Sequence, residues 1–466
     1  MHHLRIPFTP PASSDDLDSS DPRTSHDVKL EVIQVPLARF SRRRNQNNET
    51  LDLHVFVRKY TTMQQTQKPG GIGILVMGGE GPLPGLPGGY AETLAEKYNA
   101  ALYVAAEHRF YGNSLPTACK GSVACGLTTE NLKHLNVQEA LADHADVIKT
   151  FDPNMELKWI AVGGSYSGGL SAWFRVAYPD LTVGALASSG VVNALFDFPQ
   201  FDTAVHGAID TNCAMALHQI TSEVDDRLKL AHPAANIKKM FGAPQHLTDT
   251  DFRYLVADAF SMGVQYGHKH FLCDSLLKPS PASDINELLE RYVTWISKQY
   301  GSSYGAGCFY DAECIRDASS ADKWQPTSRA WRWQKCTQVA FLQSAPVSSA
   351  LRSPSLNLIS LIQECNQMFG EETTAELAET NRAFQKRFGG DHPRVDHVFY
   401  SQFSDDPWRE AGAHDVADEA SCLAVCDGCG HCSDLRTPTN DDPAGVKACR
   451  AKFETLLAKK WLASAA

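Results

Sequence analysis

The stretch that decides the fold is KWIAVGGSYSGG, which occupies residues 158–169. An apolar run leads into two glycines and Ser165, and further small residues open a run with helical spacing at 170–177. A serine on a sharp turn from a strand into a helix needs neighbours without bulk, because the backbone at the turn is strained. Its Oγ then stands above the sheet, where the helix N-terminus stabilises developing negative charge. The stretch predicts a nucleophile at Ser165, and a glycine-rich turn that holds phosphate is the alternative.

One residue of this stretch departs from the usual pattern. The common form of the turn is G-x-S-x-G, and the chain has Ser167 in place of the last glycine, followed by Gly168 and Gly169. Serine is still a small residue, so the chain can make the same sharp turn. We therefore expect the departure to leave the nucleophile at Ser165 in place.

Short apolar runs that alternate with helical patterns surround this turn. The helical patterns span 90–98 and 137–150. Apolar runs without alternation are typical of parallel strands that are covered on both faces, and their alternation with helices indicates a parallel α/β sheet. The expected strands are 73–77, 101–105, 159–162 and 183–187, followed by a last strand at 397–403.

The region between residues 196 and 394 has long helical patterns, aromatic-rich loops and no clear strand. We expect an α/β-hydrolase core formed by residues 31–195 and 395–466, with 196–394 as a large, mainly helical cap inserted before the last strand. Residues 1–30 are polar and rich in Pro, Ser and Asp, which predicts a disordered N-terminal segment.

An acyl-transfer site also needs two backbone N–H groups that bind the oxyanion. One should be the N–H of Tyr166, the residue after the nucleophile. The other should come from a loop after an early strand, and the glycine-rich loop 78–82 follows the run at 73–77. We expect the N–H of Gly79 there, because glycine lets the backbone approach a substrate closely. A simple turn is the alternative.

The base and its orienting carboxylate should follow the nucleophile in the order Ser, Asp, His. Asp406 comes directly after the expected strand at 397–403, where a carboxylate is well placed to orient an imidazole. Two histidines follow it. His414 is only eight residues away, whereas His431 lies in a later loop after an intervening element. We therefore choose His431 as the base over His414.

Charged residues near these motifs are expected to have roles other than acyl transfer. We interpret Glu107, His108 and Arg109 as structural, with their charges paired behind the site. Glu80 is a candidate for binding the free amino end of a substrate. A solvated loop carboxylate is the alternative for Glu80.

Composition limits the partners and the compartment. The 466-residue chain has a net charge of −11, which argues against nucleic acid, because neutralising phosphates needs a basic face. No stretch approaches the roughly 18–20 continuous apolar residues of a membrane helix. Thirteen cysteines, with close pairs Cys119/Cys125 and Cys308/Cys314, indicate disulfides in a secreted or lumenal protein. No signal-peptide region is visible, so either a leader is missing, which we favour, or the cysteines stay reduced.

Four cysteines surround the expected base, namely Cys422, Cys426, Cys429 and Cys432. Such spacings occur in zinc sites, and a His431 that bound zinc could not act as a base. A redox-active CxxC dithiol is a further alternative. With nine other cysteines in the chain we expect disulfides instead, with no metal, and a clamp on the loop that carries the base.

Four motifs occur in an order that resembles a known family: EHRFYGNSLP at 107–116, GGSY at 163–166, DPW at 406–408 and GHCSDLR at 430–436. The chain is similar to lysosomal Pro-X carboxypeptidase, dipeptidyl peptidase II and thymus-specific serine protease. The last motif looks like the His-His-Leu-Asp-Leu-Arg segment of that family. The likeness covers residues 70–200 and 395 to the end, and 187–198 is closest to the thymus-specific branch.

This resemblance implies an α/β-hydrolase core with a helical cap and a triad at Ser165, Asp406 and His431. It also implies exopeptidase cleavage after proline in acidic compartments, namely a lysosomal or vacuolar lumen. Trp408 would line the pocket for the proline ring, since a flat aromatic face suits a compact apolar ring.

The chain departs from the family at two places within its motifs, and its segment before residue 70 is poorly matched to the family. Gln402-Phe403 stands where the family has Asn-Gly, and Cys432 stands where it has a second histidine. Neither departure removes a triad member. Both departures argue against transferring the family's preference for proline to this chain unchanged.

The function we expect is a serine exopeptidase that cleaves short peptides after proline through an acyl-enzyme. A carboxylesterase or lipase-like hydrolase on the same fold is the alternative, because the triad chemistry is shared and only the pocket differs. A non-catalytic binding protein is a third interpretation, against which the intact triad set argues. The expected partners are peptides with proline near one end, without a cofactor, a nucleic acid or a membrane, and a homodimer is a possible assembly.

Overall fold

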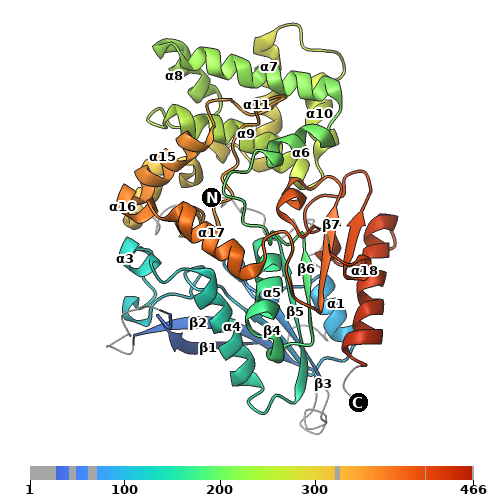
Figure 1. Cartoon of the computed structure of the whole chain (residues 1–466). Helices are drawn as coiled ribbons and strands as arrows, with labels where there is room; N and C mark the ends of the chain where they lie inside the picture. The colour runs from blue at the N-terminus through green and yellow to red at the C-terminus, as the bar shows by residue number, and fades with distance from the viewer. Residues whose placement is uncertain (1–27, 41–48, 61–70, 321–325, 415, 464–466) are drawn as a thin grey trace.

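The computed structural model describes residues 28–40, 49–60, 71–320, 326–414 and 416–463. Eight strands form one sheet in the order β1-β2-β4-β3-β5-β6-β7-β8 (Figure 1). The first two strands pair antiparallel with their neighbours, and all later pairs are parallel. The strands are β1 (Val28–Pro36), β2 (Thr50–Lys59), β3 (Gly71–Met77), β4 (Leu102–Ala106), β5 (Leu157–Gly164), β6 (Gly184–Ser188), β7 (Val398–Phe403) and β8 (Ser421–Ala424).

The four strands expected from apolar runs are confirmed as β3, β4, β5 and β6, and the strand expected at 397–403 is confirmed as β7, with small shifts at their ends. One expectation is wrong in detail: β8 follows β7, so the helical insertion precedes the last two strands and not the last strand alone. β8 has only four residues and lies at the edge of the sheet, where Leu423 is 50% exposed. So short and exposed a strand needs no apolar run, which is why the sequence pattern did not reveal it.

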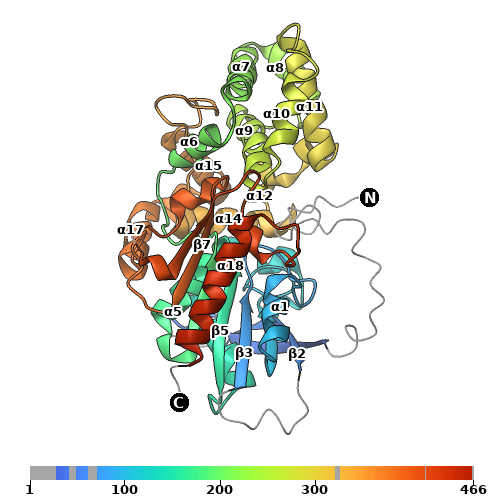
Figure 2. The same ribbon diagram turned by 90° about the vertical axis from the view of Figure 1, so that its right-hand side faces the viewer.

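Helices cover both faces of the sheet, as Figures 1 and 2 show. On one face, α4 (Val137–Phe151) and α5 (Tyr166–Ala177) pack on the larger hydrophobic core. On the other, α1 (Tyr90–Lys97) and α18 (Ala444–Leu456) pack on a second cluster that includes Ile74, Tyr103, Ile160, Leu186, Phe399 and Trp461. Burial on both faces explains the continuous apolar runs of the central strands.

In the described residues between β6 and β7, the regular structure is helical apart from a single bridge of Asp197 with Leu342. These helices form the cap, which lies above the core and to its left in Figure 1. The chain thus has an α/β-hydrolase core with a large helical cap. The α-helices are α6 (Gln200–Ala208), α7 (Thr211–Leu228), α8 (Ala231–Met240), α9 (Asp249–Gln265), α10 (Lys269–Leu277), α11 (Ile285–Tyr300), α12 (Ala312–Arg316), α14 (Pro326–Gln334), α15 (Leu358–Phe369), α16 (Glu371–Thr374) and α17 (Leu377–Phe388).

The domain limits at residues 196 and 394 stay a prediction. The segment 1–30 was predicted to be disordered. Its residues 1–27 lie outside the described residues, and residues 28–30 belong to β1.

Two short helices, α2 (Val123–Gly126) and α3 (Thr129–Leu132), precede α4 in the core.

Six disulfides pair twelve of the thirteen cysteines. The predicted pairs Cys119–Cys125 and Cys308–Cys314 are both present. Near the expected base, disulfides join Cys422 to Cys449 and Cys426 to Cys429. Three of the four cysteines that could have bound zinc are therefore oxidised, and Cys432 is the one free thiol of the described chain. The other two bridges are Cys213–Cys273 and Cys336–Cys365.

The motif at 107–109 is structural, as expected. The Arg109 guanidinium is fully buried and bonds both carboxylate oxygens of Asp143, at 2.7 and 2.8 Å. The Glu107 carboxylate accepts hydrogen bonds from the backbone N–H of Leu83 and from Ser114 Oγ.

In the described parts of the chain, no helix combines the length and apolarity needed to cross a membrane.

Adding one methyl group to Gly184 tests whether Trp461 of the C-terminal segment packs against β6. A Cβ built on Gly184 of β6 would lie 2.1 Å from the Trp461 ring. We expect Gly184→Ala to destabilise the protein by about 1–3 kcal/mol, because a packed core does not accept the added volume. Gly207→Ala is the control, since nothing lies within 4 Å of its new Cβ and alanine favours the helix α6. Thermal unfolding of both variants measures this. Equal melting temperatures would contradict the packing of Trp461 on β6.

Candidate active site

Ser165 is the only residue between β5 and α5, and its backbone is strained. Its φ is 60° and its ψ is −127°, a conformation that residues other than glycine rarely adopt. The Ser165 N–H donates to the Ser188 carbonyl on the adjacent strand β6, at 2.9 Å. The residue is 6% exposed and stands at the N-terminus of α5. This is the geometry that the sequence predicted for a nucleophile on a strand-to-helix turn.

The small residues around Ser165 are required by close backbone contacts. A Cβ on Gly163 would lie 2.1 Å from the Ser167 carbonyl oxygen, and one on Gly168 would lie 2.8 Å from that of Ser188. Ser167 also fits: its Oγ accepts a hydrogen bond from the Gly164 N–H at 3.0 Å and donates one to the Gly164 carbonyl at 2.8 Å. The serine that replaces the usual glycine thus closes the turn with its own side chain.

Asp406 and His431 are brought together by the fold. His431 Nδ1 lies 2.8 Å from Asp406 Oδ2, and both side chains are buried. Asp406 begins the short helix η7 (Pro407–Ala411) after β7, and its other oxygen accepts the Trp408 N–H at 3.0 Å. Burial opposes the protonated form of His431, but the Asp406 carboxylate and Cys432 more than offset this and hold the pKa of the imidazole well above its usual value.

The other histidine considered from the sequence, His414, does not approach Asp406. It is exposed, its backbone N–H donates to the Asp391 carbonyl, and its Nε2 lies 3.5 Å from the Glu410 carbonyl. The structure therefore joins Asp406 to His431 and leaves His414 outside the site.

The loop of His431 lies directly against the turn of Ser165. The next residue, Cys432, donates its N–H to Ser189 Oγ at 2.9 Å. A Cβ on Gly164 would lie 2.9 Å from the Cys432 sulfur. The residues that flank the predicted base and nucleophile are thus in contact. The buried Nε2 of His431 has no hydrogen-bond partner within the described chain, which leaves it available to the reacting groups.

The two residues expected to form the oxyanion hole also lie beside the turn. Tyr166 starts α5, and its phenol is anchored away from the turn by Gln334 Nε2 at 2.6 Å and His108 Nε2 at 3.1 Å. Gly79 follows β3, and a Cβ there would lie 3.4 Å from that of Ser167. The glycine loop after β3 and the N-terminus of α5 therefore face each other.

Glu80 is buried in the same place, with 4% of its surface exposed. Burial raises the pKa of Glu80 to about 7, although its own backbone N–H and the positive charge of His431 act in the opposite direction. Within the described chain, that backbone N–H is the only group that bonds the carboxyl. The solvated-loop interpretation of Glu80 is therefore wrong, because the side chain is buried.

Trp408 lies in an aromatic cluster next to His431. Its ring centroid is 6.5 Å from that of His431 and 5.2–5.7 Å from those of Phe198, Phe201 and Phe341. Trp408 is partly buried and comes from the core, whereas Phe201 and Phe341 come from the cap. An apolar surface is thus built beside the base from both parts of the chain.

Gln265, at the end of α9 in the cap, was not predicted from the sequence. Its backbone carbonyl accepts the His431 N–H at 2.7 Å, and its Oε1 accepts Trp408 Nε1–H at 2.9 Å. A Cβ on Gly430 would lie 2.4 Å from the same carbonyl. One buried cap residue therefore orients both the predicted base and the aromatic wall. An isolated glutamine at a helix end carries no motif by which it could have been found.

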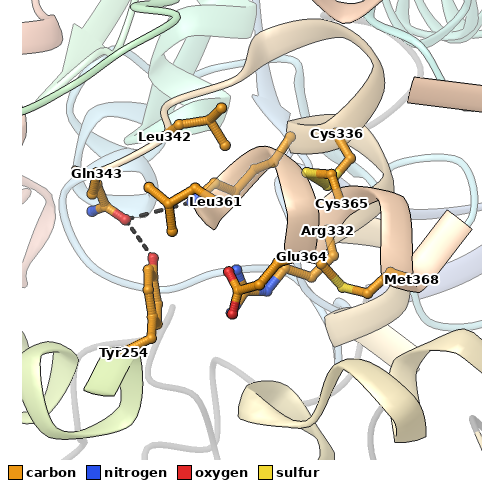
Figure 3. A pocket seen from close by; sticks show the side chains of 10 residues that line it. Tyr254, Arg332, Cys336, Leu342, Gln343, Leu361, Glu364, Cys365 and Met368 are labelled. Atoms are coloured by element: carbon orange, nitrogen blue, oxygen red, sulfur yellow. Dashed lines mark hydrogen bonds between the residues drawn. A yellow bond between two sulfur atoms is a disulfide. The ribbon is translucent and has the colours of Figure 1, made fainter. Parts of the chain in front are cut away.

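A second polar cluster lies inside the cap, around a cavity of about 10 Å³ (Figure 3). Tyr254 donates to Gln343 Oε1 at 2.6 Å, and the charges of Arg332, Lys335 and Glu364 are buried nearby. Burial lowers the pKa of Lys335 to about 7 and raises the pKa of Glu364. None of the residues predicted for the active site lines this cavity, which has room for about one water molecule.

The comparison with known proteins agrees with this geometry. A family model described as serine carboxypeptidase S28 matches residues 46–453. The chain belongs to the serine carboxypeptidase S28 family. As a member of S28 it is a serine peptidase, which confirms the enzyme class expected from the sequence.

Named relatives of this S28 peptidase come from plants and animals. It is 32% identical to probable serine protease EDA2 of Arabidopsis thaliana, over 81% of this chain and 76% of that one. It is 26% identical to thymus-specific serine protease of Mus musculus (88% and 84% covered) and 26% to lysosomal Pro-X carboxypeptidase of Homo sapiens (80% and 77%). The family resemblance is confirmed. Equal identities do not separate its branches, so the closer likeness to the thymus-specific branch stays a prediction.

The free thiol of the S28 peptidase offers a chemical test of the site. Alkylation of Cys432 by iodoacetamide would add bulk between Gly164 and His431. We expect at least about a tenfold loss of peptidase activity, since small displacements of reacting groups are costly. The same treatment of Cys432→Ser should leave the activity of that variant unchanged, with labelling followed by mass spectrometry. Full activity at complete labelling would contradict the contact between the two loops.

Proposed function

We propose that Ser165, Asp406 and His431 form the catalytic triad of a serine exopeptidase that cleaves short peptides after proline. The observation that carries the proposal is the 2.8 Å contact of His431 Nδ1 with Asp406, beside a serine held at positive φ. Asp406 orients the imidazole and stabilises its protonated form, which agrees with the direction of the pKa shift of His431. Nε2, which has no partner in the described chain, then takes the Ser165 proton.

The reaction proceeds by acyl transfer. Ser165 Oγ attacks the carbonyl carbon, and His431 holds the proton that leaves the hydroxyl. The oxyanion binds to the N–H groups of Tyr166 and Gly79, which lie on facing segments. His431 returns the proton to the leaving amine, and the C–N bond breaks. Water then hydrolyses the acyl-enzyme by the same proton transfers in the second half of the cycle.

The aromatic cluster supports a compact apolar group at the cleaved residue. The Trp408 face, with Phe201 and Phe341 from the cap, suits the ring of proline. Human lysosomal Pro-X carboxypeptidase, whose name states this specificity, is 26% identical over 80% of the chain. A cap over the core would restrict access to the ends of peptides, which favours exopeptidase action.

Glu80 is proposed to bind the free amino end of the substrate. The buried carboxyl receives a hydrogen bond from its own backbone N–H and forms no ion pair within the described chain, and a substrate ammonium group would supply one. Its position beside His431 would place the amino end one or two residues from the cleaved bond. This role assigns dipeptide release to the enzyme.

We further propose a secreted or lysosomal location. Six disulfides form and persist in oxidising compartments. Relatives include a probable extracellular serine carboxypeptidase of Arthroderma benhamiae and the lysosomal Pro-X carboxypeptidase of Homo sapiens.

The triad is tested by removing one hydroxyl. Ser165→Ala is expected to lower kcat/KM at least about 10³-fold on a proline peptide, because the nucleophile is lost. Ser167→Ala, two residues away, is the matched control and should still react with a fluorophosphonate probe. Hydrolysis of two short proline peptides, one blocked at its amino end and one at its carboxyl end, gives the rates. An active Ser165→Ala variant would refute the assignment of Ser165.

The same pair of peptides tests the substrate class. Cleavage of only the peptide with a free amino end supports dipeptide release. Cleavage of only the peptide with a free carboxyl end supports carboxypeptidase action and removes the role proposed for Glu80. If a simple ester is hydrolysed and neither peptide is cut, the triad is retained and the proposed substrate is wrong.

The pH dependence tests Glu80 separately. Its carboxyl, with a pKa raised to about 7, is charged above that pH and neutral below it. As the pH falls from about 7.5 to about 5, the KM for the peptide with a free amino end should rise in the wild type. Glu80→Gln should remove this dependence and raise KM about tenfold or more at the higher pH. An unchanged KM at the higher pH would show that the amino end binds elsewhere.

A further inference from the structure

Strand β1 forms one edge of the sheet in the part of the chain that the structure describes. It is the outermost strand of the sheet, and within the described chain β2 is its only partner (Figure 1). The Leu37 N–H donates to the Glu49 carbonyl at 2.9 Å, which continues the ladder between β1 and β2. Since the direction of the backbone groups alternates along a strand, Lys29 and Glu31 face β2 in the same way as Leu37. The N–H and C=O groups of the residues between them, Val28, Leu30 and Val32, therefore point outward.

The same three residues expose apolar side chains. Val28 is 39% exposed, and Leu30 and Val32 are each 51% exposed. Because side chains alternate between the faces, the three form one apolar row along one face of the edge strand. An edge whose backbone groups have no partner among the described residues, and whose apolar side chains are exposed, is a template for another strand. Lys29 and Glu31 lie on the opposite face and are exposed as well.

We propose that this edge binds the β1 strand of a second copy of the chain, antiparallel, with the two-fold axis at Leu30. The sequence Val28-Lys29-Leu30-Glu31-Val32 is complementary to itself in this arrangement. Lys29 lies opposite Glu31 of the second copy, and Glu31 lies opposite its Lys29. Opposite charges across an antiparallel pair stabilise the pairing, so the charges favour this partner.

The backbone pattern agrees with the same register. Leu30 pairs with Leu30 of the second copy, and Val28 pairs with Val32, so that each pair joins residues whose backbone groups point outward. Three such pairs form, each with two hydrogen bonds. The exposed apolar rows of the two strands become one continuous row across the two-fold axis. The eight-stranded sheets of the two copies would then join into one.

Other registers are less favourable. A two-fold axis at Glu31 would place two glutamates opposite each other, and an axis at Lys29 would do the same with two lysines. An axis at Val32 would place Lys29 opposite Val35, which is buried in the core of its own copy. The charge pattern thus selects Leu30 as the centre. The pairing is independent of the catalytic proposal, since β1 contributes no residue to the candidate active site.

Charge reversal tests the partner. Sedimentation equilibrium of the full-length protein is expected to show a dimer, and Lys29→Glu should raise its dissociation constant at least about tenfold, because like charges then oppose each other twice. The double exchange of Lys29→Glu with Glu31→Lys restores opposite charges and should restore the dimer. A monomeric wild type, or a double exchange as weak as Lys29→Glu, would overturn the proposal.

A cross-link tests the register and the occupant of the edge. In a Cys432→Ser background, Leu30→Cys should form an intermolecular disulfide, since the paired Cα atoms would be about 5.5 Å apart. Gln34→Cys should not, because its two copies would lie about 27 Å apart in this register. Equal cross-linking of both variants would overturn the register. A Leu30→Cys thiol that neither cross-links nor reacts with maleimide in monomeric protein would show that the chain's own N-terminal residues cover the edge, which also overturns the proposal.

Discussion

The backbone of Ser165 is the constraint on which the rest of the site depends. A residue other than glycine at a φ of 60° costs about 1–3 kcal/mol, so its surroundings must hold it there. The Ser165 N–H donates to the Ser188 carbonyl, and the Ser165 carbonyl accepts the Gly169 N–H at 3.0 Å. A side chain on Gly163 or Gly168 would disturb this turn, because each Cβ would collide with a backbone oxygen. Contacts from the sheet, the helix and the glycines thus hold the strained backbone of Ser165 in place.

His431, the proposed base, is held in a different way, since it belongs to no strand or helix and precedes the short helix η9 (Ser433–Leu435). Asp434 fixes the loop of His431 to the core, with its carboxylate bonded to Ser401 Oγ at 2.5 Å and to Ser188 Oγ. From the other side, the Gln265 carbonyl of the cap fixes the backbone of His431. The cap is therefore part of the site and not only a cover over it. A movement of α9 would shift the imidazole and Trp408 together, because Gln265 bonds to both.

The sequence predicted the parts of the fold that follow from burial on two faces. The strands β3 to β6 contain the continuous apolar runs, and Ser165 follows the run at 159–162, which ends in Gly163 and Gly164. β2 was missed although Leu51, Leu53, Val55 and Val57 alternate with half-buried residues, the pattern of an antiparallel strand with one face in the core. The order of motifs sufficed to pair Asp406 with His431. Gln265 and the disulfide between Cys422 and Cys449 could not be predicted, because both depend on segments that meet only in the folded chain.

The departures from the common turn pattern and from the family leave the geometry of the site intact. Ser167 replaces a glycine, yet its hydroxyl bonds both backbone groups of Gly164. Gln402 bonds the Ala413 carbonyl at 2.9 Å and holds the segment after Asp406. Cys432 adopts a φ of 54°, the left-handed region, which turns its sulfur toward Gly164. A thiol in place of an imidazole removes a charged group from the edge of the site, while Asp434 still anchors the loop. In the proposed enzyme, such changes would alter the surface that meets a substrate without moving Asp406 or His431, so specificity could differ beside an unchanged proposed triad.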